Sequence, residues 1–180
     1  MNKLIYTGIG SRNAPEHILE LCTYLGELLA KTGWILRSGG AEGCDTAFEI
    51  GCDKAKGLKE IYLPWKNFNN NKSNLYNIPW QAYETIKIFH PNPNTLKGGS
   101  IKLMARNSQQ VLGQQLTEPS RVIIFYAPID KKGKVLGGTG QAIRIANHYN
   151  IDTINLYNYK LDDIKGMLNK IIVARFFKNV

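Results

Sequence analysis

The sequence predicts an α/β fold, with a mostly parallel sheet that carries helices on both faces. Three features support it: apolar runs without polar alternation, amphipathic helical stretches between them, and glycine-containing turns directly after strand-like runs. Continuous apolar strands separated by helices are typical of parallel sheets covered on both sides. We therefore expect a Rossmann-like, doubly wound arrangement, and the length favours a single domain over residues 1–180.

In the first half of the chain, predicted strands and helices alternate regularly. Apolar residues at 3.6-residue spacing predict the first helix, which a capping box of Asn13 and Glu16 would begin. Residues 64–79 are rich in Asn, Lys and aromatic side chains and are expected to form a loop insertion. The predicted strands are 4–7, 34–38 and 60–63, and the predicted helices are 14–32 and 43–56.

The second half continues the alternation after two consecutive helical stretches. If the strand order is 3-2-1-4-5, the chain reverses direction between the first and fourth strands. Ligands of open α/β sheets bind at such a reversal, outside the carboxyl ends of the strands. The predicted elements are helices at about 80–88 and 100–116, a strand at 121–126, a helix at 140–149, a strand at 152–156 and a terminal helix from about 161.

The glycine-containing turns predict phosphate binding. Without Cβ atoms, backbone N–H groups approach an anion closely, and the N-terminus of a following helix adds partial positive charge. Arg12 begins a helix and would clamp a phosphate, or alternatively pair with Glu16 on the surface. The predicted binding residues of these turns are Gly8, Gly10, Ser11, Arg12, Ser38, Gly39, Gly40, Gly137, Gly138, Thr139 and Gly140.

Further candidates lie on the predicted helices. Asp45 falls in a first helical turn, where it either stabilises the helix terminus or reaches a ribose hydroxyl. Arg106 and Asn107 lie midway along a helix and point either to the crevice or to solvent. For any catalysis, the candidate acids are Glu42, Asp45 and Glu49.

The composition favours an anionic partner and gives no sign of a metal or cofactor. The formal net charge is +9, which suits nucleotides or nucleic acid, although dispersed surface lysines give the same total. The three cysteines form no CxxC pair, and no apolar run is long enough for a membrane span. We therefore expect a cytoplasmic protein with no metal, no cofactor and no membrane partner.

The motifs also occur in a known order: Gly10-Ser11-Arg12, then the stretch 38–45, then Arg106-Asn107, then Gly137-Gly138-Thr139. In this order the chain resembles the DNA-processing protein A (DprA/Smf) family within the SLOG superfamily, which also contains the LOG (lysine-decarboxylase-like) proteins. The resemblance covers about residues 4–156 and is greatest to compact phage and mobile-element members. It implies an extended Rossmann fold, a homodimer, and single-stranded DNA phosphates near Arg12, Ser38, Gly39 and Arg106.

Two departures from the family patterns leave the function open. DprA proteins carry a basic residue at the position of Glu42, and a carboxylate there would repel a phosphate track. LOG phosphoribohydrolases carry a glutamate where this chain has Arg144. The leading hypothesis is a protein that binds a nucleotide or single-stranded nucleic acid. The alternatives are a LOG-like nucleotide N-glycosidase or deoxyribosyltransferase, and a receptor or sequestering protein for a nucleotide signal such as an ADP-ribose derivative.

Overall fold

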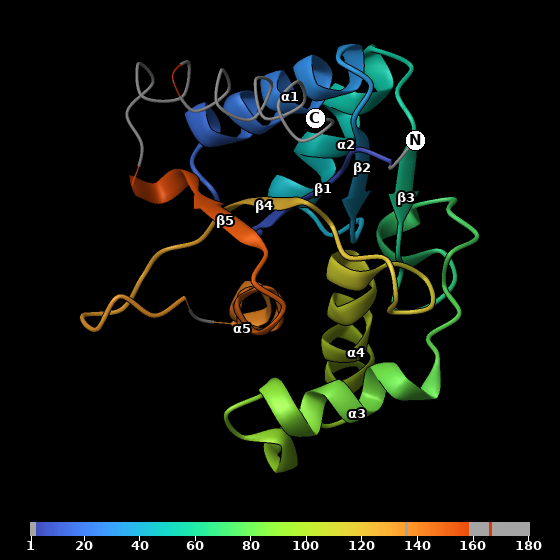
Figure 1. Ribbon diagram of the computed structural model, residues 1–180, viewed down its shortest axis with the longest axis vertical. Coiled ribbons are helices and arrows are strands. Elements are labelled where there is room, and N and C mark those ends of the chain that lie inside the picture. Colours follow the sequence, from blue (N-terminus) through green and yellow to red (C-terminus); the bar gives the residue numbers. More distant parts are fainter. Residues whose placement is uncertain (1–2, 136, 159–165, 167–180) are drawn as a thin grey trace, which may run out of the picture.

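A parallel sheet forms the centre of the protein in the computed structural model, which describes residues 3–135, 137–158 and 166 (Figure 1). The strand order is β3-β2-β1-β4-β5, and every pairing is parallel. The predicted fold class is therefore confirmed, and the strand order is the one assumed when the crevice was predicted. The strands are β1 (Ile5–Gly10), β2 (Ile35–Ser38), β3 (Lys59–Ile61), β4 (Val122–Tyr126) and β5 (Asp152–Asn155).

Helices cover both faces of this sheet (Figure 1). On one face, α1 (Glu16–Lys31) and α2 (Cys44–Lys54) enclose a core around Tyr6, Leu25 and Phe48. On the other face, α4 (Gly99–Leu112) and α5 (Gly137–His148) bury residues of β1 and β4. A fifth helix, α3 (Trp80–Phe89), packs against α4 through a separate apolar cluster. The continuous apolar strands predicted this two-sided burial because no strand face is left for water.

The switch point lies between β1 and β4. Gly10 pairs with Tyr126 in the register of these two strands, so both strands end at the same level. The chain then turns away at Ser11, whose amide donates a hydrogen bond to the Tyr126 carbonyl oxygen at 2.8 Å. Because β1 leads to a helix on one face and β4 to a helix on the other, the loops diverge and leave a crevice between them.

Some predicted element boundaries are wrong. The capping box is absent: Pro15 precedes α1, no side chain caps it, and the Asn13 amide donates to Ser11 Oγ instead. Helix α4 ends at Leu112, before the predicted 116, because Gly113 follows with a φ of 79° that a helix does not continue. Helix α5 begins at Gly137, so the predicted glycine turn is its first turn. The predicted terminal helix lies outside the described residues.

Residues 64–79 form the connection from β3 to α3 and include one short 3-10 helix, Phe68–Asn70. The connection is tied to the sheet end, because Leu63 N–H donates to the Leu75 carbonyl at 2.8 Å and Ser73 Oγ donates to the Ile61 carbonyl at 2.6 Å. Among the described residues, no helix is both long and apolar enough to cross a membrane.

Candidate functional site

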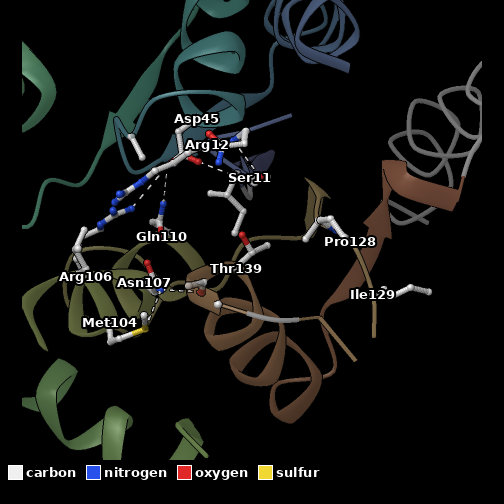
Figure 2. Close-up of a pocket in the computed structure, with 18 residues that line it drawn as sticks. Ser11, Arg12, Asp45, Met104, Arg106, Asn107, Gln110, Pro128, Ile129 and Thr139 are labelled. Carbon is white, nitrogen blue, oxygen red and sulfur yellow. Dashed lines mark hydrogen bonds and ion pairs between the residues drawn. The ribbon is translucent and has the colours of Figure 1, made fainter. Parts of the chain in front are cut away.

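A cavity of about 490 Å³ opens where β1 and β4 end. Its walls come from the turn after β1, the start of α2, the middle of α4, the loop after β4 and the first turn of α5 (Figure 2). This is the crevice that the strand order predicts. The predicted site residues that line it are Gly10, Ser11, Arg12, Asp45, Arg106, Asn107, Gly137, Gly138 and Thr139.

Other predicted residues lie near the cavity without lining it. The hydroxyl of Ser38 is fully buried and donates to the Gly8 carbonyl oxygen at 2.7 Å, so this side chain joins β2 to β1. Gly8 lies within β1, and Gly140 packs its backbone against Val135. Gly39 and Gly40 are buried and do not line the cavity. From the turn after β2, Ala41 lines the cavity instead.

Asp45 occupies the place that was predicted for a ligand anion. Its carboxylate accepts hydrogen bonds from the amides of Gly10 and Gly39, each at 3.1 Å. Gln110 donates a longer third one through Nε2, at 3.4 Å. The carboxylate therefore joins the turns after β1 and β2, and it lies in the first turn of α2 as one of the two alternatives from the sequence required. These two amides are consequently not free to bind a phosphate.

Arg106 is a buried cation without a full set of partners. Its side chain is 4% exposed, and Nε has no hydrogen-bond partner. Its nearest counter-charge is Asp45, at 3.8 Å between NH1 and Oδ2, which exceeds hydrogen-bond length. Figure 2 shows Arg106 and Gln110 reaching from α4 toward Asp45. Since buried guanidinium donors are normally satisfied, this arrangement leaves capacity for a further acceptor in the cavity.

Gly39 allows Arg106 to take this position. A Cβ atom at residue 39 would lie 1.4 Å from Arg106 NH1 and 2.3 Å from Gln110 Nε2. No side chain fits there unless both groups move. The glycine that the sequence assigned to phosphate binding thus acts by making room for the cation.

Burial shifts the pKa values of both charged groups. It lowers the pKa of Arg106 to about 10, and the positive charge of Arg12 adds to this effect while Asp45 opposes it. Burial also raises the pKa of Asp45, against the opposing influence of Arg106 and of the backbone amides. Arg106 therefore stays protonated at neutral pH, in a place where its charge is poorly solvated.

The opposite wall combines a helix N-terminus with apolar groups. Asn107 Nδ2 donates to the Gly138 carbonyl oxygen at 2.9 Å, which holds α4 against the first turn of α5. The amides of that turn have no acceptors within the helix and carry its partial positive charge. Leu103, Met104 and Ile129 supply apolar surface nearby.

Sequence reasoning missed part of the lining. Leu103 and Gln110 were not predicted, but they lie three and four residues from the predicted Arg106, so helical periodicity alone would have placed them on its face of α4. Pro128 and Ile129 follow β4 without any motif, and only the tertiary structure brings them to the cavity.

The other candidate acids lie elsewhere. Glu42 is exposed and lines a separate surface groove between α1 and α2, so it does not oppose an anion in the cavity. Glu49 pairs with Lys59 at 2.8 Å and accepts a hydrogen bond from Asn71. Arg144, at the position of the LOG glutamate, donates to the carbonyl oxygen of Phe89. Within the described residues, no cluster of His, Cys, Asp or Glu has the arrangement of metal ligands.

Comparison with known proteins places this site in a recognisable fold. Residues 3–88 match the model of the SLOG cluster4 family. No curated protein sequence matches the chain. DNA processing protein A from Helicobacter pylori, described for its single-stranded DNA binding mode, is similar with a TM-score of 0.56 and 21% identity, over 95% of this chain and 74% of that one.

Two further solved structures share the fold. DNA processing protein A from Streptococcus pneumoniae gives a TM-score of 0.56 at 17% identity, and the match spans 98% of this chain but only 56% of that one. The molybdenum cofactor binding protein from Rippkaea orientalis gives 0.55 at 24% identity, over 95% and 86% of the two chains. Together, the family match over residues 3–88 and these shared folds confirm the predicted resemblance to the DNA-processing protein A and SLOG proteins.

Proposed function

We propose that the cavity binds phosphate groups of a nucleotide or of single-stranded nucleic acid. The observation that carries this proposal is the guanidinium of Arg106, which is buried at the cavity wall with an unpaired Nε and only a 3.8 Å ion pair. A phosphate oxygen is the kind of acceptor that a guanidinium fork matches best.

Neighbouring features support the proposal. Arg12 is exposed at the cavity rim and supplies a second cation. The first turn of α5 lines the cavity with backbone amides that lack partners in the helix. The chain as a whole carries a formal charge of +9, which draws polyanions toward it. The H. pylori protein of the same fold binds single-stranded DNA, and phosphate recognition in the cavity is consistent with the same chemistry.

Salt-dependent binding tests this function. We expect a labelled oligothymidylate to bind more weakly as salt rises, with a slope in log Kd of about 0.7 per neutralised phosphate. Arg12→Ala should weaken binding and reduce that slope by about 0.7, with little change in thermal midpoint because the side chain is exposed. Lys54→Ala, which removes an exposed cation from the groove between α1 and α2, is the matched control and should bind normally.

The proposal fails if neither thymidine monophosphate nor the oligonucleotide binds at low ionic strength. Native mass spectrometry of the purified protein separates the binding hypotheses further. A small molecule retained in stoichiometric amount would favour a receptor or sequestering protein for a nucleotide signal.

A nucleotide N-glycosidase is a second candidate, and one observation favours it. Of the three acids considered, Asp45 alone lines the cavity, and burial raises its pKa as a general acid requires. Free base released from nucleoside monophosphates, and not released by Asp45→Asn, would support this activity. Intact substrates after long incubation with the wild-type protein would exclude it.

A further inference from the structure

The cavity-lining face of α4 continues beyond the cavity. Leu103, Arg106 and Gln110 line the cavity, and the preceding residue on the same face is Gly99, four residues before Leu103. The indole of Trp65 lies against that position, 3.3 Å from where a Gly99 Cβ would be. At 1.5 Å per residue, this point is about 10 Å along the helix from Arg106. Trp65 therefore lies at one end of the helix face that also carries Arg106.

The ring of Phe68 also connects Trp65 to Arg106, because it contacts both side chains. The Phe68 ring lies 6.0 Å from the guanidinium carbon of Arg106. Phe68 also meets Trp65 edge to face, with 5.1 Å between the ring centroids and 87° between the planes. Trp65 itself is 40% exposed. The indole is thus fixed in orientation by its neighbours while part of it stays open to solvent, as a stacking surface for a planar ring requires.

Charge along this surface suits a polyanion. The connection 64–79 and helix α4 contain no Asp or Glu, and the chain from 85 to 117 contains none either. Acidic residues gather instead in the groove between α1 and α2, which Glu16, Glu20, Glu27 and Glu42 line. A single strand leaving the cavity would therefore meet no carboxylate along this segment of α4. The lysines of these acid-free segments are all exposed: Lys66, Lys72, Lys87, Lys97 and Lys102.

We infer that Trp65 is a base-stacking site for single-stranded nucleic acid whose phosphate binds beside Arg106. This inference rests on the proposed function and adds the direction of the strand: out of the cavity, along α4, toward the connection between β3 and α3. It also assigns a role to the segment 64–79, which no motif of the sequence explains. A mononucleotide would bind the cavity without reaching Trp65.

Tryptophan fluorescence tests the stacking site. The chain has three tryptophans: Trp34 is buried at 5% exposure, Trp65 is half-exposed, and Trp80 is 69% exposed on α3. In a Trp80→Phe background, Trp65 is the one exposed indole. We expect hexathymidylate to quench this fluorescence and thymidine 5′-monophosphate to leave it unchanged.

Affinity gives an independent measurement. Trp65→Ala should weaken hexathymidylate binding about tenfold or more and leave monophosphate binding unchanged. Trp65→Leu keeps an apolar cover over the first turn of α4 but removes the ring, and should show the same selective loss. Trp80→Ala, which removes the other exposed indole, is the matched control and should bind both ligands normally.

The outcomes separate this inference from the proposed function. If monophosphate and hexathymidylate both bind through Arg12 but the Trp65 variants bind the oligonucleotide normally, the stacking site is refuted and the proposed function stands. The same holds if hexathymidylate causes no quenching. If neither ligand binds the wild-type protein, both proposals are refuted.

Discussion

Arg106 and Asp45 face each other across the wall of the cavity, 3.8 Å apart, with side chains that are only 4% and 5% exposed. The two charges do not satisfy each other, because Asp45 is held by the amides of Gly10 and Gly39. The site therefore contains an internal anion beside a cation with spare donors. This arrangement determines whether several substitutions should strengthen or weaken anion binding.

Neutralising Asp45 should strengthen anion binding. Asp45→Asn removes a buried negative charge next to the proposed phosphate, so we expect oligothymidylate affinity at neutral pH to rise several-fold, or about 1 kcal/mol. Fluorescence anisotropy at low salt measures it. Glu20→Gln makes the same charge change on exposed α1 and should have no effect. Weaker binding by a folded Asp45→Asn protein would contradict this account of the site.

The same carboxylate predicts a pH dependence. Burial raises the pKa of Asp45, so the group takes up a proton at a higher pH than an ordinary aspartate, whose pKa is about 3.9. Protonation removes its repulsion of a bound phosphodiester, which does not itself titrate in this range. Wild-type affinity should therefore increase as pH falls toward and through the raised pKa, and Asp45→Asn should lack the increase. Parallel pH profiles for the two proteins would refute the prediction.

Gly39→Ala should displace Arg106. The new methyl group would fall 1.4 Å from NH1, so the guanidinium must leave its place and oligothymidylate binding should drop at least tenfold. In an Arg106→Ala background, the 1.4 Å clash with NH1 is removed while Gln110 Nε2 remains at 2.3 Å, so the same substitution should reduce the thermal midpoint less than it does in wild type. Equal losses in the two backgrounds would show that Gly39 acts independently of Arg106.

The ion pair between the buried Arg37 and Glu60 should make the free energy of unfolding depend on pH. Arg37 is 1% exposed and its Nε donates to Glu60 at 2.6 Å, while Tyr62 donates to the same carboxylate at 2.7 Å. Burial alone would raise the pKa of Glu60, but these hydrogen bonds outweigh it and the pKa is lowered. Its stabilising contribution is therefore present above the ordinary value of 4.5 and is lost as pH falls through the lowered folded value.

Glu60→Gln should accordingly reduce the free energy of unfolding at pH 7 by about 1–3 kcal/mol. The difference from wild type should shrink as pH falls below 4.5, as urea denaturation at several pH values would show. Glu84→Gln breaks an exposed pair with Lys87 and should change stability by less than about 0.5 kcal/mol. A constant difference across the pH range would argue against the assigned interaction.

Local sequence patterns were sufficient to predict the architecture. They predicted the ends of the helices and strands only in part. The apolar runs of β1 and β4 required burial on both faces, and that requirement leads to a parallel sheet with a switch point. The start of α5 was predicted too late because glycine has low intrinsic helix propensity, whereas here the first turn is held by Asn107 from α4.

The candidate site, too, was predicted from the sequence only in part. The glycine turns correctly indicated the edge of the sheet at which Arg12, Arg106 and Gly138 meet. The sequence had no means of showing that the amides of Gly10 and Gly39 already donate to Asp45, since that carboxylate is 35 residues away from one of them. Nor did any pattern bring Ile129 to the cavity or Trp65 to the first turn of α4, because both lie in irregular connections whose course depends on what they pack against.

The sequence by itself determined the layers of the fold and the edge of the sheet at which the cavity opens, since these follow from hydrophobic periodicity and the positions of glycine. Only the tertiary structure decided which donors remain available there. Hydrogen-bond partners of buried polar groups come from segments distant in the chain, and each donor used internally is lost to a ligand. In this protein the nearest amides are used by Asp45, and Arg106 keeps unpaired donors at the cavity wall.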